Sequence, residues 1–139
     1  MKAGDIVFDA DFVHDDGTSG PKLIVLLTDD RGDPVLVVKT TSQSERYSRT
    51  PGPALEHRFP AFHLPVGSCS FAKPTWVDLG QVFAFAPADL SAGLASGRLR
   101  VVDTLPAPLF VELLEATMAA RDTTGRHRAI LQRGLSLLA

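Results

Sequence analysis

Cysteine, tryptophan and tyrosine are almost missing from this sequence, which has one residue of each among 139. The lone cysteine, Cys69, cannot form an internal disulfide or a cysteine-rich zinc site. No apolar run approaches the roughly 20 residues that a membrane-spanning helix needs, and no charged-then-apolar leader opens the chain, so we expect a cytoplasmic protein with no membrane association. The net charge of −2 gives no global attraction for nucleic acid. Any such partner must therefore be held by a local basic groove.

The composition is otherwise that of an ordinary globular domain. Hydrophobic residues make up 45% of the chain and charged residues 22%, which excludes wholesale disorder, collagen and coiled coil. A chain of this length has the usual size of one domain and buries enough surface to fold without disulfides or a structural metal. We expect one domain, in which residues 1–121 form a barrel with its closing helix and residues 122–139 form a helical tail.

Short β-rich runs fill most of the chain. Alternating apolar and polar side chains predict a strand over residues 5–12, and the nearly unbroken apolar run 22–28 predicts a strand that is covered on both faces. A third strand is expected at Val35–Thr41, close enough in sequence to pair with the second in antiparallel fashion. Polar, proline-rich residues 42–60 predict a long surface loop. Further short strands are predicted at 61–65, as a sheet edge, and at 73–79, 81–85 and 98–102.

The end of the chain has helical periodicity. One or two helical turns are expected at residues 88–95. Pro108 suits the first turn of a longer helix, which apolar residues at helical spacing carry to about Arg121. Asp122 or Thr123 can cap a second helix. We therefore predict a mainly β fold with a C-terminal helix, of the α+β class: a small, strongly bent SH3-like barrel of five to seven antiparallel strands.

Several residue types that carry enzyme chemistry occur in patterns that favour structural roles. The four histidines have no metal-ligand spacing, and the aspartates between residues 15 and 33 lack the register of a calcium loop, so we expect no metal and no cofactor. Cys69 has no neighbouring base or helix start that would activate it, which favours an inert thiol over a nucleophile. Trp76 lies on a predicted strand and is interpreted as a core or interface anchor.

A concentration of polar side chains at the end of the third predicted strand is the main functional signal. The run Lys39-Thr40-Thr41-Ser42-Gln43-Ser44, followed by Arg46 and Arg49, combines hydroxyls, an amide and three cations where a strand meets a loop. Such groups bind phosphate oxygens, and an amide can bind a base edge. Arg58 could extend this path along a nucleic-acid backbone. The same side chains could equally form a solvated strand end.

Six short segments add a second signal because they occur together in one order. They are Met1–Val7 with its Gly-Asp-hydrophobic start, Leu23–Leu26, Thr41–Ser42, Leu64–Gly67, Thr75–Val82 and Gly97–Leu105. This pattern resembles the MazF/PemK (Kid-like) toxins of bacterial toxin–antitoxin systems over roughly residues 1 to 120. The resemblance implies a homodimeric SH3-like barrel that cleaves single-stranded RNA without a metal, and an antitoxin protein that covers the RNA groove.

The resemblance also implies which residues form the site. In the family, an arginine just ahead of the second strand and a Thr or Ser at the end of the third act on the scissile phosphate. The hydroxyl matches Thr41, with Ser42 beside it, whereas the nearest cation is Lys22 and lacks the guanidinium fork that holds two phosphate oxygens at once. The predicted catalytic residues are Lys22, Thr41 and Ser42, and the predicted RNA-binding residues are Thr40, Gln43, Arg46 and Arg49.

Two other functions remain open at this point. A barrel of the same fold that has lost cleavage would bind a protein or RNA partner, a hypothesis that the missing arginine and the acidic net charge favour. A small-molecule or structural domain that shares only the barrel has less support, because no pocket-forming motif is present. The basic stretch 121–133 is interpreted first as a packing helix, although it could also grip RNA or meet a second protein.

Overall fold

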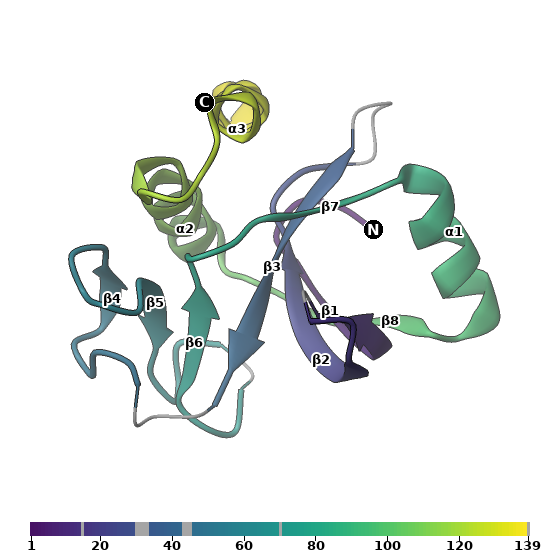
Figure 1. Cartoon of the computed structure of the whole chain (residues 1–139), viewed down its shortest axis with the longest axis horizontal. Coiled ribbons are helices and arrows are strands. Elements are labelled where there is room, and N and C mark those ends of the chain that lie inside the picture. Colours follow the sequence, from purple (N-terminus) through teal and green to yellow (C-terminus); the bar gives the residue numbers. More distant parts are fainter. Residues whose placement is uncertain (15, 30–33, 43–45, 70, 139) are drawn as a thin grey trace.

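An antiparallel sheet flanked by helices makes up the computed structural model of the chain (Figure 1), which describes residues 1–14, 16–29, 34–42, 46–69 and 71–138. Within these ranges there are eight strands: β1 (Asp5–Val13), β2 (Ser19–Leu26), β3 (Val35–Thr41), β4 (Gly52–Ala54), β5 (Ala61–Leu64), β6 (Thr75–Asp78), β7 (Phe83–Phe85) and β8 (Leu99–Thr104). The same ranges hold three helices: α1 (Pro87–Ser96), α2 (Ala107–Ala119) and α3 (Gly125–Leu138). This arrangement confirms the expected α+β class with a C-terminal helix.

Strand β3 is the junction of the sheet. One of its edges pairs with β2, where Ile24 lies opposite Lys39. Its other edge pairs with β7 along its first half and with β6 through its last two residues, Thr40 and Thr41. The strand order is β4-β5-β6-β3-β2-β1-β8, with β7 also beside β3. Strand β3 therefore belongs to both halves of the sheet, and its C-terminal end lies where they meet.

The sheet is open over the residues that the structure describes, because β4 and β8 stand at opposite ends of the strand order and do not pair with each other. The closed barrel expected from the sequence is therefore not seen, and these ranges hold eight strands rather than five to seven. The additional strand, β4, lies in the predicted loop and contains Pro53. Proline donates no ladder hydrogen bond and is tolerated at a sheet edge, which is where β4 lies. Strand β5 is consequently internal, between β4 and β6, and not the expected edge.

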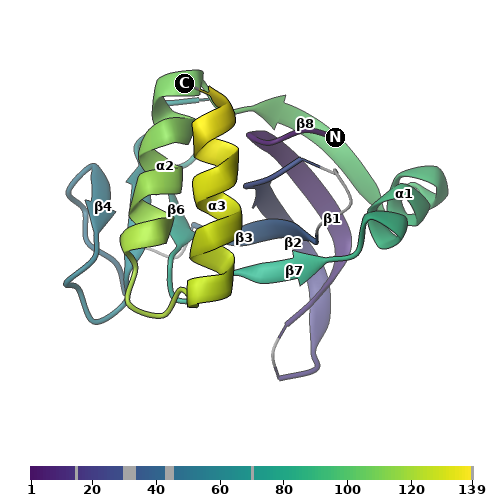
Figure 2. The ribbon, with the colours of Figure 1, turned by 90° about the horizontal axis from the view of Figure 1, so that it is seen from above.

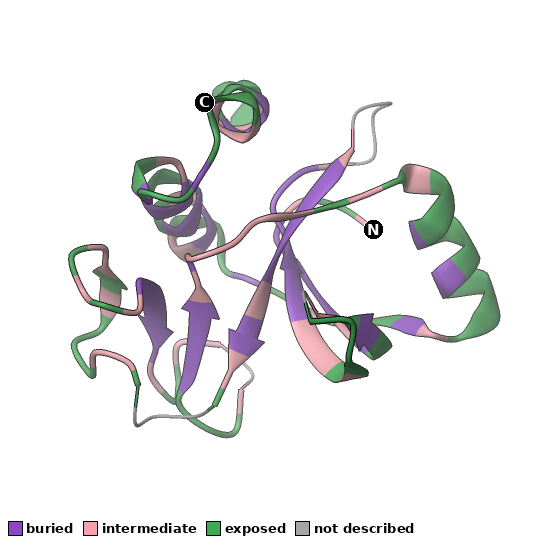
Figure 3. Cartoon of the chain, in the orientation of Figure 1, coloured by how far each residue is buried: buried purple, intermediate pink, exposed green. Residues whose placement is uncertain are grey.

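Buried residues make up the end of β2 and most of β3 (Figure 3). Val25 and Val38 belong to the larger apolar cluster, which α2 and α3 complete. Ile24 and Val37 belong to a second cluster on the opposite face, with Leu90 of α1.

Residues 24–26 are at most 1% exposed, so the predicted cover on both faces is confirmed for these three residues. Each such side chain stabilises the fold by about 1.5–3 kcal/mol. The strand itself begins at Ser19 and ends at Leu26 rather than spanning 22–28, and Lys22 and Leu23 are only half-buried.

Helices α2 and α3 lie side by side over one side of the sheet (Figure 2). Leu113 and Leu114 of α2 share the larger cluster with Ile130 and Leu131 of α3. Pro108 lies in the first turn of α2, as predicted. None of the described helices is long and apolar enough to span a bilayer.

The corner between α2 and α3 differs from the sequence prediction. Helix α2 ends at Ala119 rather than near Arg121, because the Ala120 backbone is extended, with φ −64° and ψ 137°. The Thr124 hydroxyl caps α3 by accepting the His127 N–H at 3.2 Å. Thr123, one of the two predicted caps, is buried and donates its hydroxyl to the Thr117 carbonyl at 2.7 Å. Its side chain therefore ties the corner to α2 instead of capping α3.

Candidate functional site

The β2–β3 face that buries Ile24 and Val37 becomes polar at one end. Ile24 lies opposite Lys39 in the register pair nearest this end, and Lys22 and Thr41 each lie two residues beyond that pair on their own strand. Alternate residues of a strand point to the same face, so Lys22, Lys39 and Thr41 continue the face of the second apolar cluster. All three are half-buried. The two ammonium groups and the alcohol therefore lie on the same face of the paired strands.

An open cavity of about 400 Å³ lies at this polar end. It is bounded by β2, β3 and the end of β6, by the loops on either side of β4, and by the corner between α2 and α3. Among the described residues that line it, five side chains are cationic and two are carboxylates: Lys22, Lys39, Arg46, Arg58, Arg121, Asp78 and Asp122. The chain has a net charge of −2, so this cavity holds a local excess of positive charge. A cavity of this size accommodates a ligand of nucleotide dimensions.

A second, shallower hollow of about 250 Å³ adjoins the cavity. Lys22, Thr40 and Thr41 line both hollows, and Ser42 lines the second. The two hollows therefore meet at Lys22, Thr40 and Thr41.

Lys22 has an altered acidity. Its burial lowers the pKa of the ammonium below the ordinary value of 10.5, the nearby charge of Lys39 lowers it further, and Asp78 acts in the opposite direction. Desolvation disfavours the charged form of a lysine, and a neighbouring cation does the same. Lys22 consequently releases its proton more readily than an exposed lysine, while a bound anion would restore the charged form.

Asp78 contacts two other residues that line the cavity, Lys39 and Gly80. Its carboxylate lies 3.8 Å from the Lys39 ammonium and accepts the Gly80 N–H at 2.7 Å. A Cβ at position 80 would lie 3.0 Å from the same carboxylate oxygen, so the absence of a side chain at Gly80 permits this turn. Asp78 thus partly neutralises Lys39.

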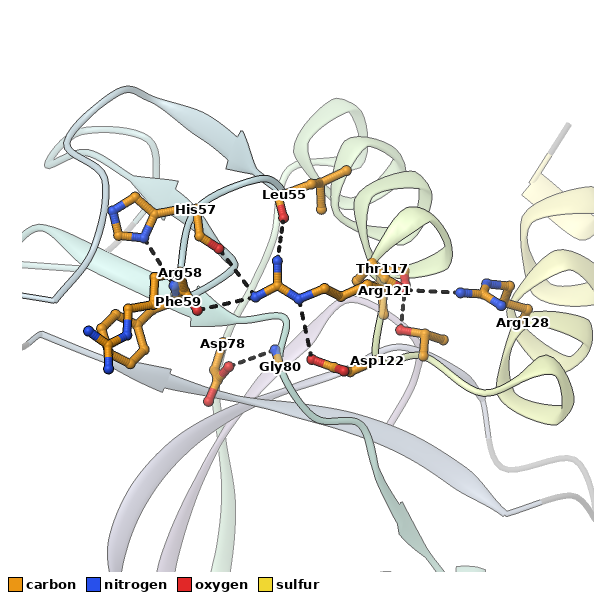
Figure 4. A network of polar contacts seen from close by, with 12 residues as sticks. Leu55, His57, Arg58, Phe59, Asp78, Gly80, Thr117, Arg121, Asp122 and Arg128 are labelled. Atoms are coloured by element: carbon orange, nitrogen blue, oxygen red, sulfur yellow. Dashed lines mark hydrogen bonds and ion pairs between the residues drawn. The ribbon is translucent and has the colours of Figure 1, made fainter.

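The guanidinium of Arg121 ties the α2–α3 corner to the loop between β4 and β5 (Figure 4). It donates to the carbonyls of Leu55, His57 and Arg58 at 3.5, 3.4 and 3.2 Å. Its Nε lies 4.0 Å from the Asp122 carboxylate. These contacts hold the loop that carries the Arg58 side chain beside the cavity.

Aromatic rings form one wall of the cavity. Tyr47 and Phe59 both line it and meet edge to face, with ring centroids 6.1 Å apart. The guanidinium carbons of Arg46 and Arg58 lie 6.0 and 5.4 Å from the centre of the Phe59 ring, within the range of a cation–π contact. Burial raises the pKa of the Tyr47 phenol, Asp78 adds to this effect, and Arg46 opposes it. The phenol therefore stays protonated at neutral pH.

The residues predicted from the sequence fall into three groups. Lys22, Thr40, Thr41 and Arg46 line the cavity together, and Ser42 lines the adjoining hollow. Arg49 is exposed and lines neither of these two hollows. Gln43 lies outside the described residues. The Thr40 hydroxyl donates to the Leu23 carbonyl at 2.8 Å, so it supports the β2–β3 pairing.

Seven described residues that line the cavity were not predicted as part of the site: Tyr47, Phe59, Pro60, Asp78, Gly80, Arg121 and Asp122. Tyr47 directly follows the predicted Arg46, and Asp78 ends a segment that carries the family resemblance, so each had a local signal. Arg121 belongs to the basic stretch 121–133, which was interpreted first as a packing helix. No sequence pattern placed Arg121 or Asp122 beside β3, because their approach depends on how α2 packs on the sheet.

No group of three or more His, Cys, Asp or Glu side chains that could hold a metal ion occurs within the ranges the structure describes. Trp76 is 3% exposed and His63 is 8% exposed, so both are core residues, and Cys69 packs at the edge of the larger apolar cluster.

Neither protein-family models nor the sequences of curated proteins give a match to this chain. Its function is therefore inferred from the chemistry of the cavity and from the resemblance noted above.

Proposed function

We propose that this protein is a metal-independent endoribonuclease of the MazF/PemK type that cleaves single-stranded RNA. The observation that supports the proposal is the shared position of Lys22 and Thr41, which line a cavity with an excess of cationic side chains. A lysine and an alcohol side by side can bind the non-bridging oxygens of one phosphodiester. Arginines around them are suited to the flanking phosphates.

The proposed reaction needs no group beyond the RNA and the protein. The ribose 2′-oxygen attacks the adjacent phosphorus while the bond from phosphorus to the 5′-oxygen breaks. The products are a 2′,3′-cyclic phosphate and a 5′-hydroxyl, and the proton lost by the attacking hydroxyl is balanced by the proton gained by the leaving oxygen. Lys22 stabilises the negative charge that grows on the phosphate oxygens, and Thr41 donates a hydrogen bond to them. Ser42 and Arg46 hold the strand on either side.

The proposal extends to the type of fold, the compartment, the oligomeric state and a protein partner. Strand β3 pairs with β7 and β6 along one edge, and the sheet is open between β4 and β8 over the described residues. We propose that this sheet is an opened SH3-like barrel of MazF/PemK type. We propose that the protein acts in the cytoplasm as a homodimer and that a cognate antitoxin covers the cavity.

One observation favours a non-catalytic alternative. The position at which the family has an arginine holds Lys22, a point charge that cannot grip two phosphate oxygens. A chain with such a site could bind RNA or an acidic segment of a protein without cleaving a bond.

Incubation of the purified protein with single-stranded RNA in EDTA tests the proposal. We expect cleavage to persist and to leave cyclic-phosphate ends. Lys22→Gln and Thr41→Val should each slow cleavage about 10²-fold or more, the usual effect of removing one group that stabilises developing charge. Lys73→Gln is a matched control, because Lys73 is exposed and does not line the cavity.

The outcomes separate the two candidate functions. RNA that is bound but stays intact would support the binding domain. Absence of both binding and cleavage would overturn the endoribonuclease and the RNA-binding domain, and would leave only the binding of an acidic protein segment. Normal cleavage by Lys22→Gln and Thr41→Val, with unchanged melting temperatures, would show that the site is elsewhere.

A further inference from the structure

Three aromatic rings stack in a column that ends at the cavity. The rings of His63 and Trp76 are 4.4 Å apart and inclined by 13°, and those of Trp76 and Tyr47 are 6.1 Å apart and inclined by 22°. His63 and Trp76 are buried, whereas Tyr47 is only half-buried and lines the cavity. Tyr47 is therefore the outermost ring, with Trp76 against one of its faces.

The backbone holds this column in place. His63 of β5 and Trp76 of β6 are register partners in adjacent antiparallel strands, so their rings lie on the same face of the sheet. The indole N–H of Trp76 donates to the Ser48 carbonyl at 2.8 Å, which fixes the segment that carries Tyr47. An aromatic platform that is rigid before binding loses little entropy when a second ring stacks on it.

The charges beside the column are placed for a nucleotide. Arg46 and Arg58 lie against Phe59, whose ring is inclined by 66° to that of Tyr47. Lys22 lines the same cavity as Tyr47. A flat apolar ring, a set of guanidinium groups and an ammonium in one open cavity match the three parts that a single strand presents, namely a base and the phosphates on either side of it.

We infer that Tyr47 is the floor of a nucleobase subsite, on which one base of a single-stranded RNA stacks while its phosphate lies against Lys22 and Thr41. This inference rests on the proposed function, because it uses the same cavity. Every nucleobase has a π-face, so the subsite requires a base without selecting its identity. A base on Tyr47 extends the column of His63 and Trp76 by one ring.

The test compares two strands that the protein cannot cleave. One is a 2′-O-methyl oligonucleotide, which has no free 2′-hydroxyl to attack, and the other is an abasic strand of equal length and charge. The wild-type protein should bind the base-bearing strand about 5- to 100-fold more tightly, the range expected for loss of base–aromatic stacking. Trp76 is the only tryptophan of the chain and contacts Tyr47, so its fluorescence should change with the base-bearing strand and not with the abasic strand.

Two substitutions at Tyr47 separate stacking from other effects of the side chain. Tyr47→Phe keeps the ring and should keep the preference for the base-bearing strand. Tyr47→Leu should reduce that preference to less than about twofold, with binding of the abasic strand unchanged. Thermal unfolding of each variant checks that the fold is retained.

Lys22→Gln distinguishes failure of this inference from failure of the proposed function, because it should weaken binding of both strands by the same factor. If both strands bind equally well and Lys22→Gln weakens both, the phosphate site stands and the base subsite is overturned. A preference that survives Tyr47→Leu overturns it as well. If neither strand binds to the wild-type protein, both proposals fail.

Discussion

The pKa of Lys22 depends on the groups that surround its ammonium. Its methylene stem and ammonium are partly withdrawn from water, a second ammonium on Lys39 lies nearby, and the carboxylate of Asp78 is shared with Lys39 at 3.8 Å. The first two effects lower the pKa of Lys22 and the third only partly compensates. Without a bound anion, the ammonium of Lys22 is therefore less stable in its charged form than that of a surface lysine. A bound anion would stabilise the charged form.

The lowered pKa of Lys22 predicts how RNA binding depends on pH. Affinity for a 2′-O-methyl strand should be constant at low and neutral pH and should fall as the pH rises through the lowered pKa, because the neutral amine no longer attracts phosphate. Lys22→Arg stays charged over this range, so its affinity should fall less. Titration of binding from pH 7 to pH 10 by fluorescence anisotropy measures the difference. Parallel curves for the two proteins would show that Lys22 does not carry the phosphate contact.

At the scale of elements, α1 packs against β8 at Gly93, a residue without a side chain. A Cβ at Gly93 of α1 would lie 2.6 Å from Cδ1 and 2.7 Å from Cγ of Leu99 in β8. Leu99 is 2% exposed, so it cannot turn away into solvent. Glycine lowers the intrinsic stability of a helix interior, and here that loss permits the helix backbone to approach the sheet closely.

Gly93→Ala should therefore destabilise the fold although alanine is the better helix former. Overpacking of a filled core costs about 1–3 kcal/mol, and we expect the free energy of unfolding to fall by that amount in urea titration. Gly134→Ala in α3 is the matched control, because nothing lies within 4 Å of a Cβ built there. It should stabilise the protein by about 0.5–1 kcal/mol. Equal effects of the two substitutions would mean that α1 does not press on Leu99.

At the scale of the whole molecule, charge is distributed unevenly. The chain has 14 Lys and Arg residues and 16 Asp and Glu residues, yet the described lining of the cavity has five cationic side chains and two carboxylates. A cleft lined by one sign of charge attracts a counter-ion locally, whatever the total charge of the protein. The acidic remainder of the surface should repel RNA from other faces.

Binding of RNA should consequently weaken as salt rises, and the size of this effect should depend on the number of phosphates that the cavity contacts. For a single strand, the logarithm of the binding constant falls by about 0.7 per phosphate contacted for each tenfold rise in salt. We expect a slope of about −2 to −3, and Arg46→Gln or Arg58→Gln should each reduce its magnitude by about 0.7. Arg126→Gln, an exposed position on α3, is the control and should leave the slope unchanged. A slope near zero would exclude the cavity as a phosphate site.

The sequence by itself determined the features that depend on neighbouring residues. Strand β3 has the predicted bounds, and Pro108 opens a helix at the predicted place. The β2–β3 pairing itself, with Ile24 opposite Lys39, joins two strands that are adjacent along the chain. Side-chain periodicity and proline geometry act over a few residues, so they can be recognised before the fold is known.

Only the tertiary structure decided what completes the cavity and whether the sheet closes. Arg121 reaches the carbonyls of residues 55, 57 and 58 from more than sixty positions away, and no local pattern encodes such a contact. Strand β4, with Pro53, forms because β5 offers it an edge, and its presence makes β5 internal. These features arise from packing between distant segments, whose free energy depends on the complete set of neighbours and not on the residue types alone.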